Sequence, residues 1–204
     1  GGLIADRTQN YKATIKTGLI IMACGYLLLS IPILSTPENI GWLLPLTCAA
    51  LFFIAFGNGL FKGNLQAIVG QMYDDFETEA AKEGPAALKA AKDKRDSGFQ
   101  IFYVFINVGG LIAPFVAPLL REWWLNTNGL VYNAQLPALC HEFLANSGAM
   151  AAEAMNNLNV LMAQVGGNVS DLANECQRYL QIFNEGIHYS FIASVAAMII
   201  SLVI

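Results

Sequence analysis

A lysine lies inside one of the most apolar stretches of this sequence, in GNGLFKGNLQ from residue 57 to 66. On a helix, Asn58, Lys62 and Gln66 would be four residues apart in turn, so their side chains would line one face. A polar face within lipid is expected to turn toward a water-filled cavity or toward other helices. A buried lysine is poorly stable as a lone cation, so it would bind a carboxylate from a ligand or from another helix.

An alternative is that Lys62 lies at the inner membrane surface and extends its ammonium group to the headgroups. No further charge follows until Asp74, although the apolar pattern continues beyond the lysine. This favours an interior position for Lys62.

A second polar row lies in FQIFYVFINVGG, where Tyr103 and Asn107 are four residues apart. Asn107 could serve as a hydrogen bond between helices, or it could contact a ligand beside an inward-facing lysine. Lys62, Asn107, Asn58 and Tyr103 are therefore the candidate substrate-binding residues.

These residues lie in a chain that is too apolar for an ordinary soluble domain. Hydrophobic residues make up 55% and charged residues 13% of it, against about 25% charged in soluble domains. Four apolar stretches cover residues 17–34, 42–73, 99–120 and 187–204. A helix needs about 20 mostly apolar residues to cross a bilayer, so we predict an all-α membrane protein. The chain starts at Gly1 and ends inside an apolar run, so we expect an interior piece of a longer chain.

The basic residues predict the orientation of the spans. Eight lie before the first span and in the loop 74–98, and two lie in the insertion 121–186. By the positive-inside rule the loop 74–98 is cytoplasmic and the insertion is periplasmic or extracellular. Trp42, Trp123 and Trp124 fall at the outer span ends, as expected of an interfacial aromatic belt.

The insertion 121–186 has helical periodicity over 149–165 and 171–186, and Ser170 is a candidate cap for the second helix. On the outer side, Cys140 and Cys176 would face an oxidising compartment and are candidates for a disulfide. The sequence leaves this open, because it does not show whether their Cα atoms approach closely enough. In the loop 74–98, a solvated connector is favoured over short charged helices around Gly84-Pro85.

Enzyme and metal chemistry have little support. No CxxC pair, no Cys/His set with metal spacing and no nucleophile–base pair occurs, so we expect no enzyme, no metal and no cofactor. The net charge of −4 and the absence of a long basic run argue against nucleic acid as a partner.

The longest motifs resemble those of one transporter family. GNGLFKGNLQAIVGQMY and RDSGFQIFYVFINVGG resemble the fourth and fifth helices of the proton-dependent oligopeptide transporters, within the major facilitator superfamily. GGLIADRTQNYKATI resembles the loop after the second helix of that superfamily. The resemblance implies a partial major-facilitator bundle, from the end of helix two through helix six. Residues 1–120 would form the second to fifth helices, and residues 187–204 would begin the sixth.

The resemblance also implies roles for single residues. Lys62 would meet the carboxyl end of a peptide and a glutamate of the first helix, and Asn107 would contact the peptide. Asp6 and Arg7 would belong to the motif that latches the inner gate, although a solvated turn explains them equally well. Gly63 departs from the family pattern, which has proline there, and Asn58 stands where threonine is commoner.

The expected function is proton-coupled uptake of di- and tripeptides across the inner (plasma) membrane. Protons would be the coupling ion, and the partners would be the lipid bilayer, a small peptide, and the first helix and second bundle of the same chain. The alternatives are a relative that moves another small anion or a drug, and a membrane receptor or scaffold that binds through the insertion.

Overall fold

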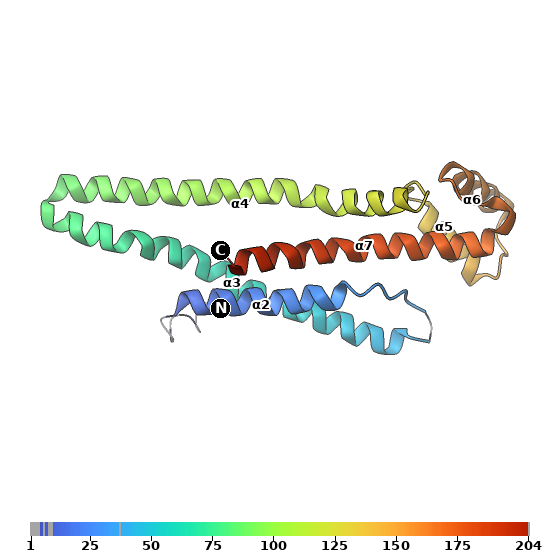
Figure 1. Cartoon of the computed structure of the whole chain (residues 1–204), viewed down its shortest axis with the longest axis horizontal. Helices are drawn as coiled ribbons and strands as arrows, with labels where there is room; N and C mark the ends of the chain where they lie inside the picture. Colours follow the sequence, from blue (N-terminus) through green and yellow to red (C-terminus); the bar gives the residue numbers. More distant parts are fainter. Residues whose placement is uncertain (1–4, 6, 8–9, 37, 204) are drawn as a thin grey trace. The chain divides into compact units, whose positions relative to one another are not determined.

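The computed structural model describes residues 5, 7, 10–36 and 38–203. Helices α2 (Tyr11–Leu29), α3 (Ile40–Glu83), α4 (Pro85–Thr127) and α7 (Leu172–Val203) are the long ones (Figure 1). Two short helices, α5 (Leu136–Ala145) and α6 (Ala152–Gln164), and the single 3₁₀ turn η1 (Val169–Asp171) lie between α4 and α7. No strand occurs in these residues, and four helices are long and apolar enough to cross a membrane. The predicted all-α membrane fold is confirmed.

The helices extend beyond several of the expected limits. α3 and α4 have 44 and 43 residues, and at 1.5 Å per residue each is about 65 Å long, roughly twice the hydrocarbon thickness of a bilayer. α2 instead ends at Leu29, five residues before the predicted limit. Pro32 lacks an N–H and disfavours a helical conformation in the residue before it, which favours a helix end near this point.

The chain divides into two compact units, which are described separately. The first contains residues 1–29, 41–114 and 194–204, and therefore all the candidate substrate-binding residues. The second contains residues 30–40 and 115–193, and therefore the insertion.

In the first unit, α2 and α3 approach closely at glycines. A Cβ placed on Gly57 would stand 2.5 Å from Met22 Cγ and 2.6 Å from the carbonyl oxygen of Gly18. A Cβ on Gly25 would stand 2.7 Å from the carbonyl oxygen of Ala50. Without a hydrophobic effect between helices in lipid, such backbone proximity is what allows van der Waals packing to hold them together.

The segment 74–98, named here the charged hairpin, is helical almost throughout. α3 ends at Glu83, and α4 begins at Pro85 after Gly84, whose φ of 128° favours glycine (Figure 1). Arg95 Nη1 lies 3.2 Å from Asp74 Oδ1 and 3.3 Å from Glu77 Oε1, so α4 is paired with α3. The preference for a solvated connector was therefore wrong, because these cross-helix pairs and the proline start hold two helices together.

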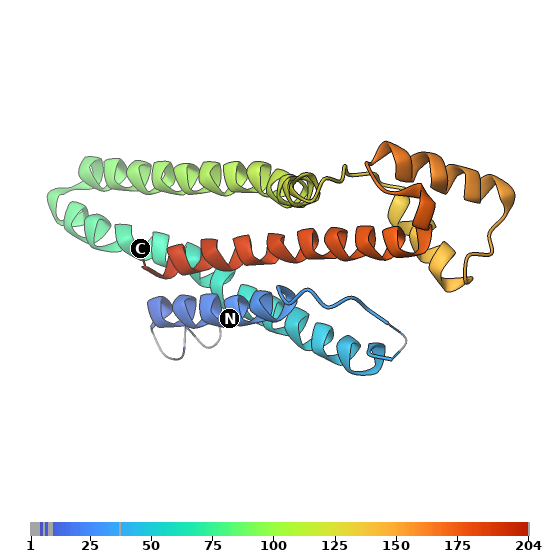
Figure 2. The ribbon, with the colours of Figure 1, turned by 45° about the vertical axis from the view of Figure 1, so that its right-hand side comes forward.

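The second unit contains a helical core built largely from the insertion. Figure 2 shows α5 and α6 beside the first turns of α7. The fully buried side chains of the core come from the end of α4, from α5, α6 and α7, and from the connection after α4; they include Leu125, Leu130, Leu136, Leu158, Met162 and Tyr179. We name residues 121–186 the insertion module.

The helix boundaries of the insertion module differ from the expectation. α6 is close to the predicted first helix, but α5 has no counterpart in the prediction. The second predicted helix is the start of α7, which continues without a break to Val203. Asn168 caps the 3₁₀ turn η1, since its side chain accepts a hydrogen bond from the Ser170 N–H at 2.9 Å. At the start of α7, Asp171 rather than Ser170 accepts a hydrogen bond from a backbone N–H, that of Asn174 at 3.3 Å.

Arg121 joins three segments of the insertion module through aromatic rings. Its guanidinium carbon lies 4.0 Å from the ring centroid of Tyr132 and 5.3 Å from that of Phe183. Its Nε is buried and makes no hydrogen bond with the described residues. The ring contacts, together with the packing of Gly186 against the main chain of Arg121, therefore hold this residue of α4 against α7.

Replacing Arg121 with alanine is expected to destabilise the insertion module by about 1–2 kcal/mol, because a partly desolvated cation–π contact is lost. Hydrogen exchange should show faster exchange of the amides of α5 and of the first turns of α7. Arg121→Lys keeps a cation over the rings and should lose less protection. Unchanged protection in the alanine variant would show that the rings do not depend on this cation.

Candidate functional site

The candidate substrate-binding residues lie on α3 and α4 of the first unit. On α3, the face toward α2 contains the buried residues Gly57, Leu60 and Asn64. With 3.6 residues per turn, the row of Asn58, Lys62 and Gln66 lies roughly on the opposite side of the helix. These three side chains are exposed in the described chain, so α2 does not cover them.

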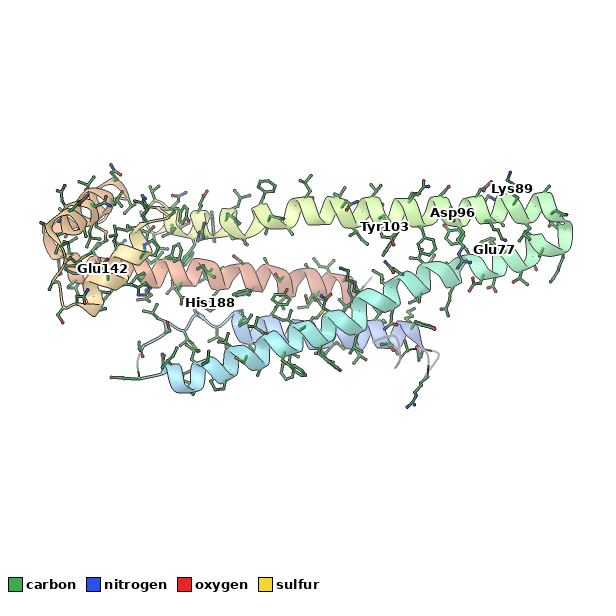
Figure 3. All side chains as sticks on the ribbon, turned by 180° about the vertical axis from the view of Figure 1, so that it is seen from behind. Glu77, Lys89, Asp96, Tyr103, Glu142 and His188 are labelled. Carbon is green, nitrogen blue, oxygen red and sulfur yellow. The ribbon has the colours of Figure 1, made fainter. Side chains whose placement is uncertain are left out.

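The row on α3 contacts the row on α4 at one point. Gln66 Nε2 donates a hydrogen bond of 3.2 Å to the hydroxyl oxygen of Tyr103. Figure 3 shows Tyr103 on α4, which runs back from the charged hairpin beside α3. The two rows that were expected from four-residue spacing therefore belong to facing sides of one helical hairpin.

The register of this hairpin relates Lys62 to Asn107. α3 and α4 run antiparallel on either side of Gly84, and the Gln66–Tyr103 bond joins them. Lys62 lies one turn before Gln66 and Asn107 lies one turn after Tyr103, so the two residues are at a similar height along the hairpin. The structure thus brings Lys62, Asn107 and Tyr103 to one side of the unit, with Asn58 one turn further along α3.

Lys62 has no ion pair within the part of the chain that the structure describes. Asn58 and Asn107 likewise make no side-chain hydrogen bond with described residues. A cation and two amides without partners, beside a tyrosine hydroxyl, can bind a carboxylate and the polar backbone of a small ligand.

Other polar residues on these helices have structural roles that the sequence reading missed. Asn64 is 1% exposed and donates a hydrogen bond of 2.7 Å to the carbonyl oxygen of Leu60. Arg95 was counted only as an inner positive charge, but its guanidinium lies over Gly70 and pairs with α3. In the same motif, Gly98 leaves room for the phenol of Tyr73. The RDSGF motif therefore supplies Arg95 to the ion pairs of the charged hairpin and Gly98 to the contact with Tyr73.

One hollow of the first unit lies between α3 and α4 in the charged hairpin. It has a volume of about 530 Å³ and is lined by residues that include Tyr73, Phe76, Ala91 and Lys94. Lys62 and Asn107 do not line it. This hollow is therefore distinct from the candidate substrate-binding residues.

The predicted gating pair is described only in part. Asp6 lies outside the described residues, and Arg7 is exposed. The gating role of this pair stays a prediction.

The predicted disulfide residues are both buried in the insertion module, and the structure has them as thiols. They belong to the same buried cluster. Interaction with Cys176, followed by burial, raises the pKa of the Cys140 thiol. Their pairing in a disulfide stays a prediction.

Comparison with known proteins decides the family. Residues 12–204 match the PTR2 family, which is described as the POT family. The chain belongs to the POT family. The resemblance drawn from the motifs around Lys62 and Asn107 is thereby confirmed.

Individual relatives agree with this family. The chain is 33% identical over 129 residues to the peptide transporter YePEPT of Yersinia enterocolitica, covering 63% of this chain and 20% of that protein. It is 34% identical over 116 residues to the di-/tripeptide transporter of Lactococcus lactis, covering 57% of this chain and 18% of that protein. A dipeptide and tripeptide permease B of Photorhabdus luminescens is 29% identical over 177 residues, covering 83% of this chain and 32% of that protein.

The POT-family chain spans about a fifth of the length of most of these curated relatives. No solved structure matches it. The four long apolar helices, together with membership of this transporter family, make it part of a multi-pass membrane protein.

Proposed function

We propose that the protein containing this chain is a secondary active transporter that takes up di- and tripeptides together with protons. The observation that carries the proposal is the α3–α4 hairpin, in which the Gln66–Tyr103 hydrogen bond aligns Lys62 with Asn107. The names of the relatives from Yersinia enterocolitica and Lactococcus lactis support a peptide substrate.

In this proposal, the ammonium group of Lys62 binds the terminal carboxylate of the peptide. Asn107 hydrogen-bonds to the peptide backbone, while Asn58 and Tyr103 line the same surface. Transporters of this kind place the substrate between helical bundles near the bilayer midplane. The exposed row of α3 would then face a cavity completed by the first helix and second bundle of the same chain.

Coupling follows from competition for one cation. When no peptide is bound, Lys62 would pair with a carboxylate of the first helix, and protonation of that carboxylate would release the lysine for the peptide. Protons are therefore the coupling ion, and no other cofactor enters the cycle. Asp6 and Arg7 would latch the inner gate.

The basic residues support a location in the inner (plasma) membrane with the charged hairpin in the cytoplasm. Five of them lie on this hairpin: Lys82, Lys89, Lys92, Lys94 and Arg95. The insertion module holds two, and would lie on the periplasmic or extracellular side.

The test is uptake by the purified full-length transporter in liposomes with an imposed inside-alkaline pH gradient. A labelled dialanine should accumulate only while the gradient lasts, and a protonophore should prevent accumulation. Unlabelled di- and tripeptides should compete, whereas a free amino acid should not. Equal accumulation without a gradient would contradict proton coupling, and competition by a non-peptide anion or drug alone would favour the alternative substrate class.

A further inference from the structure

Two cysteines are buried together in the core of the insertion module. Cys140 is on α5 and Cys176 is on the second turn of α7, and both residues are 0% exposed. They belong to one buried cluster, and each thiol is close enough to the other to shift its pKa. By contrast, Cys24 on α2 and Cys48 on α3 are exposed on their helices. The fold of the module therefore brings Cys140 together with Cys176, which is one particular pair among the four cysteines.

The surroundings of these thiols are the apolar core of the insertion module. Both belong to the same buried cluster, with Leu136, Leu158 and Tyr179 among its fully buried members. No group of three or more His, Cys, Asp or Glu residues that could hold a metal ion occurs among the described residues. A zinc site, which usually needs four ligands, is therefore not the explanation for the pair.

α5 is a short helix that depends on the core of the insertion module for its stability. α5 has only 10 residues and is flanked by irregular segments at 128–135 and 146–151. Isolated helices of this length are marginal in water. Small modules outside the cytoplasm commonly use disulfides where the hydrophobic core is limited.

We propose that Cys140 and Cys176 form a disulfide that fixes α5 to the first turns of α7. The inference rests on the proposed periplasmic or extracellular location of the module. The bond forms by exchange with a protein disulfide of a thiol-oxidising oxidoreductase in that compartment. The two cysteines together lose two protons and two electrons, and the disulfide of the oxidoreductase is reduced to a dithiol.

The position of the pair also indicates when the bond forms. A thiolate is the attacking species in exchange, but the thiols of Cys140 and Cys176 are both fully buried in the folded module. The folded module therefore reacts slowly with an external oxidant. Oxidation takes place while the segment 141–175 is still folding, and the finished bond closes this segment into a loop.

Glutamate-specific proteolysis can isolate the bond, because Glu142 and Glu175 separate the two cysteines. The full-length transporter is expressed in a host with a periplasmic oxidising system, denatured, alkylated without reductant and digested. The peptides 123–142 and 176–185 each contain one cysteine. We expect them to be found as one linked species, lighter by two hydrogen atoms than their sum, which separates on reduction.

Cys24 and Cys48 are the internal control, since both should be alkylated in the same sample. A second measurement follows native-state cleavage at Glu175, which is 8% exposed. Reduction should accelerate this cleavage about tenfold or more, by removing the cross-link from the module. The double variant C140S/C176S should be cleaved equally fast with and without reductant.

The bond and the location of the module are tested separately. Recovery of both peptides as single alkylated species would overturn the disulfide. In a chain without native cysteines, Asn157→Cys on the exposed side of α6 reports the location. Labelling of intact cells by an impermeant maleimide supports an outer module, and its absence would overturn that location. Failure of transport in the same protein affects neither readout.

Discussion

Replacing Lys62 with alanine is expected to reduce gradient-driven accumulation of labelled dialanine to the level of liposomes without protein. Truncating one partner of a ligand-binding charge pair leaves the other charge uncompensated, so a loss of about tenfold or more is expected. The same cation is proposed to alternate between the peptide carboxylate and a carboxylate of the protein. Both gradient-driven accumulation and gradient-free exchange of peptide should therefore fall.

Two further variants test the geometry of the cation at residue 62 and the effect of removing a lysine elsewhere on the protein. Lys62→Arg keeps a cation but changes its reach and geometry, so it should retain partial exchange activity. Lys89→Ala removes an exposed lysine of the charged hairpin and should transport normally. Wild-type accumulation by the Lys62→Ala variant, in protein that elutes as a monodisperse species, would remove Lys62 from the mechanism.

The helices of this fold could be predicted from the sequence because lipid leaves little choice of backbone structure. Runs such as 42–73 and 99–120 must satisfy their own hydrogen bonds, so they are helical in lipid. Their ends could not be predicted in the same way. The charges of residues 74–83 favoured a solvated connector, whereas the structure has a helix there that pairs with α4 through Asp74 and Arg95.

Four-residue spacing identified the row of Lys62 and the row of Asn107, but not how they meet. Their alignment depends on the register of the α3–α4 hairpin, which the turn at Gly84 and the Gln66–Tyr103 bond determine. A single sequence has no local signal for such a pairing. The burial of Cys140 and Cys176 in one cluster is similar, because it depends on packing between segments far apart in the sequence.

On α3, Gly59, Gly63 and Ala67 form a row of small residues next to the lysine row. The structure places α2 against Gly57 and Leu60 instead, and nothing lies within 4 Å of a Cβ on Gly59 or Gly63. The row of Gly59 and Gly63 fits the small-residue pattern of membrane helices, whereas the face that meets α2 also contains Leu60. The sequence of α3 alone does not show which row meets α2, since the contact also depends on Gly18 of α2.

The Gly57 contact predicts a large loss of stability from a small change. In a helix, glycine to alanine ordinarily gains about 1 kcal/mol from backbone propensity. At Gly57, the new methyl group would stand 2.6 Å from the carbonyl oxygen of Gly18 and 2.8 Å from the backbone nitrogen of Met22. These atoms belong to the backbone of α2, so the two helices must separate. Overpacking of this kind costs about 1–3 kcal/mol, occasionally more.

Gly57→Ala is therefore expected to lower the melting temperature of the purified full-length protein, and Gly57→Leu to prevent recovery of folded protein. Gly41→Ala on the same helix is the matched control, because a Cβ there has nothing within 4 Å. It should melt at or above the wild-type temperature. If Gly57→Ala melted as high as Gly41→Ala, the α2 and α3 backbones could not be in direct contact at this point. The orientation of the Lys62 row away from α2 would then lose its structural basis, because it follows from the same helix face.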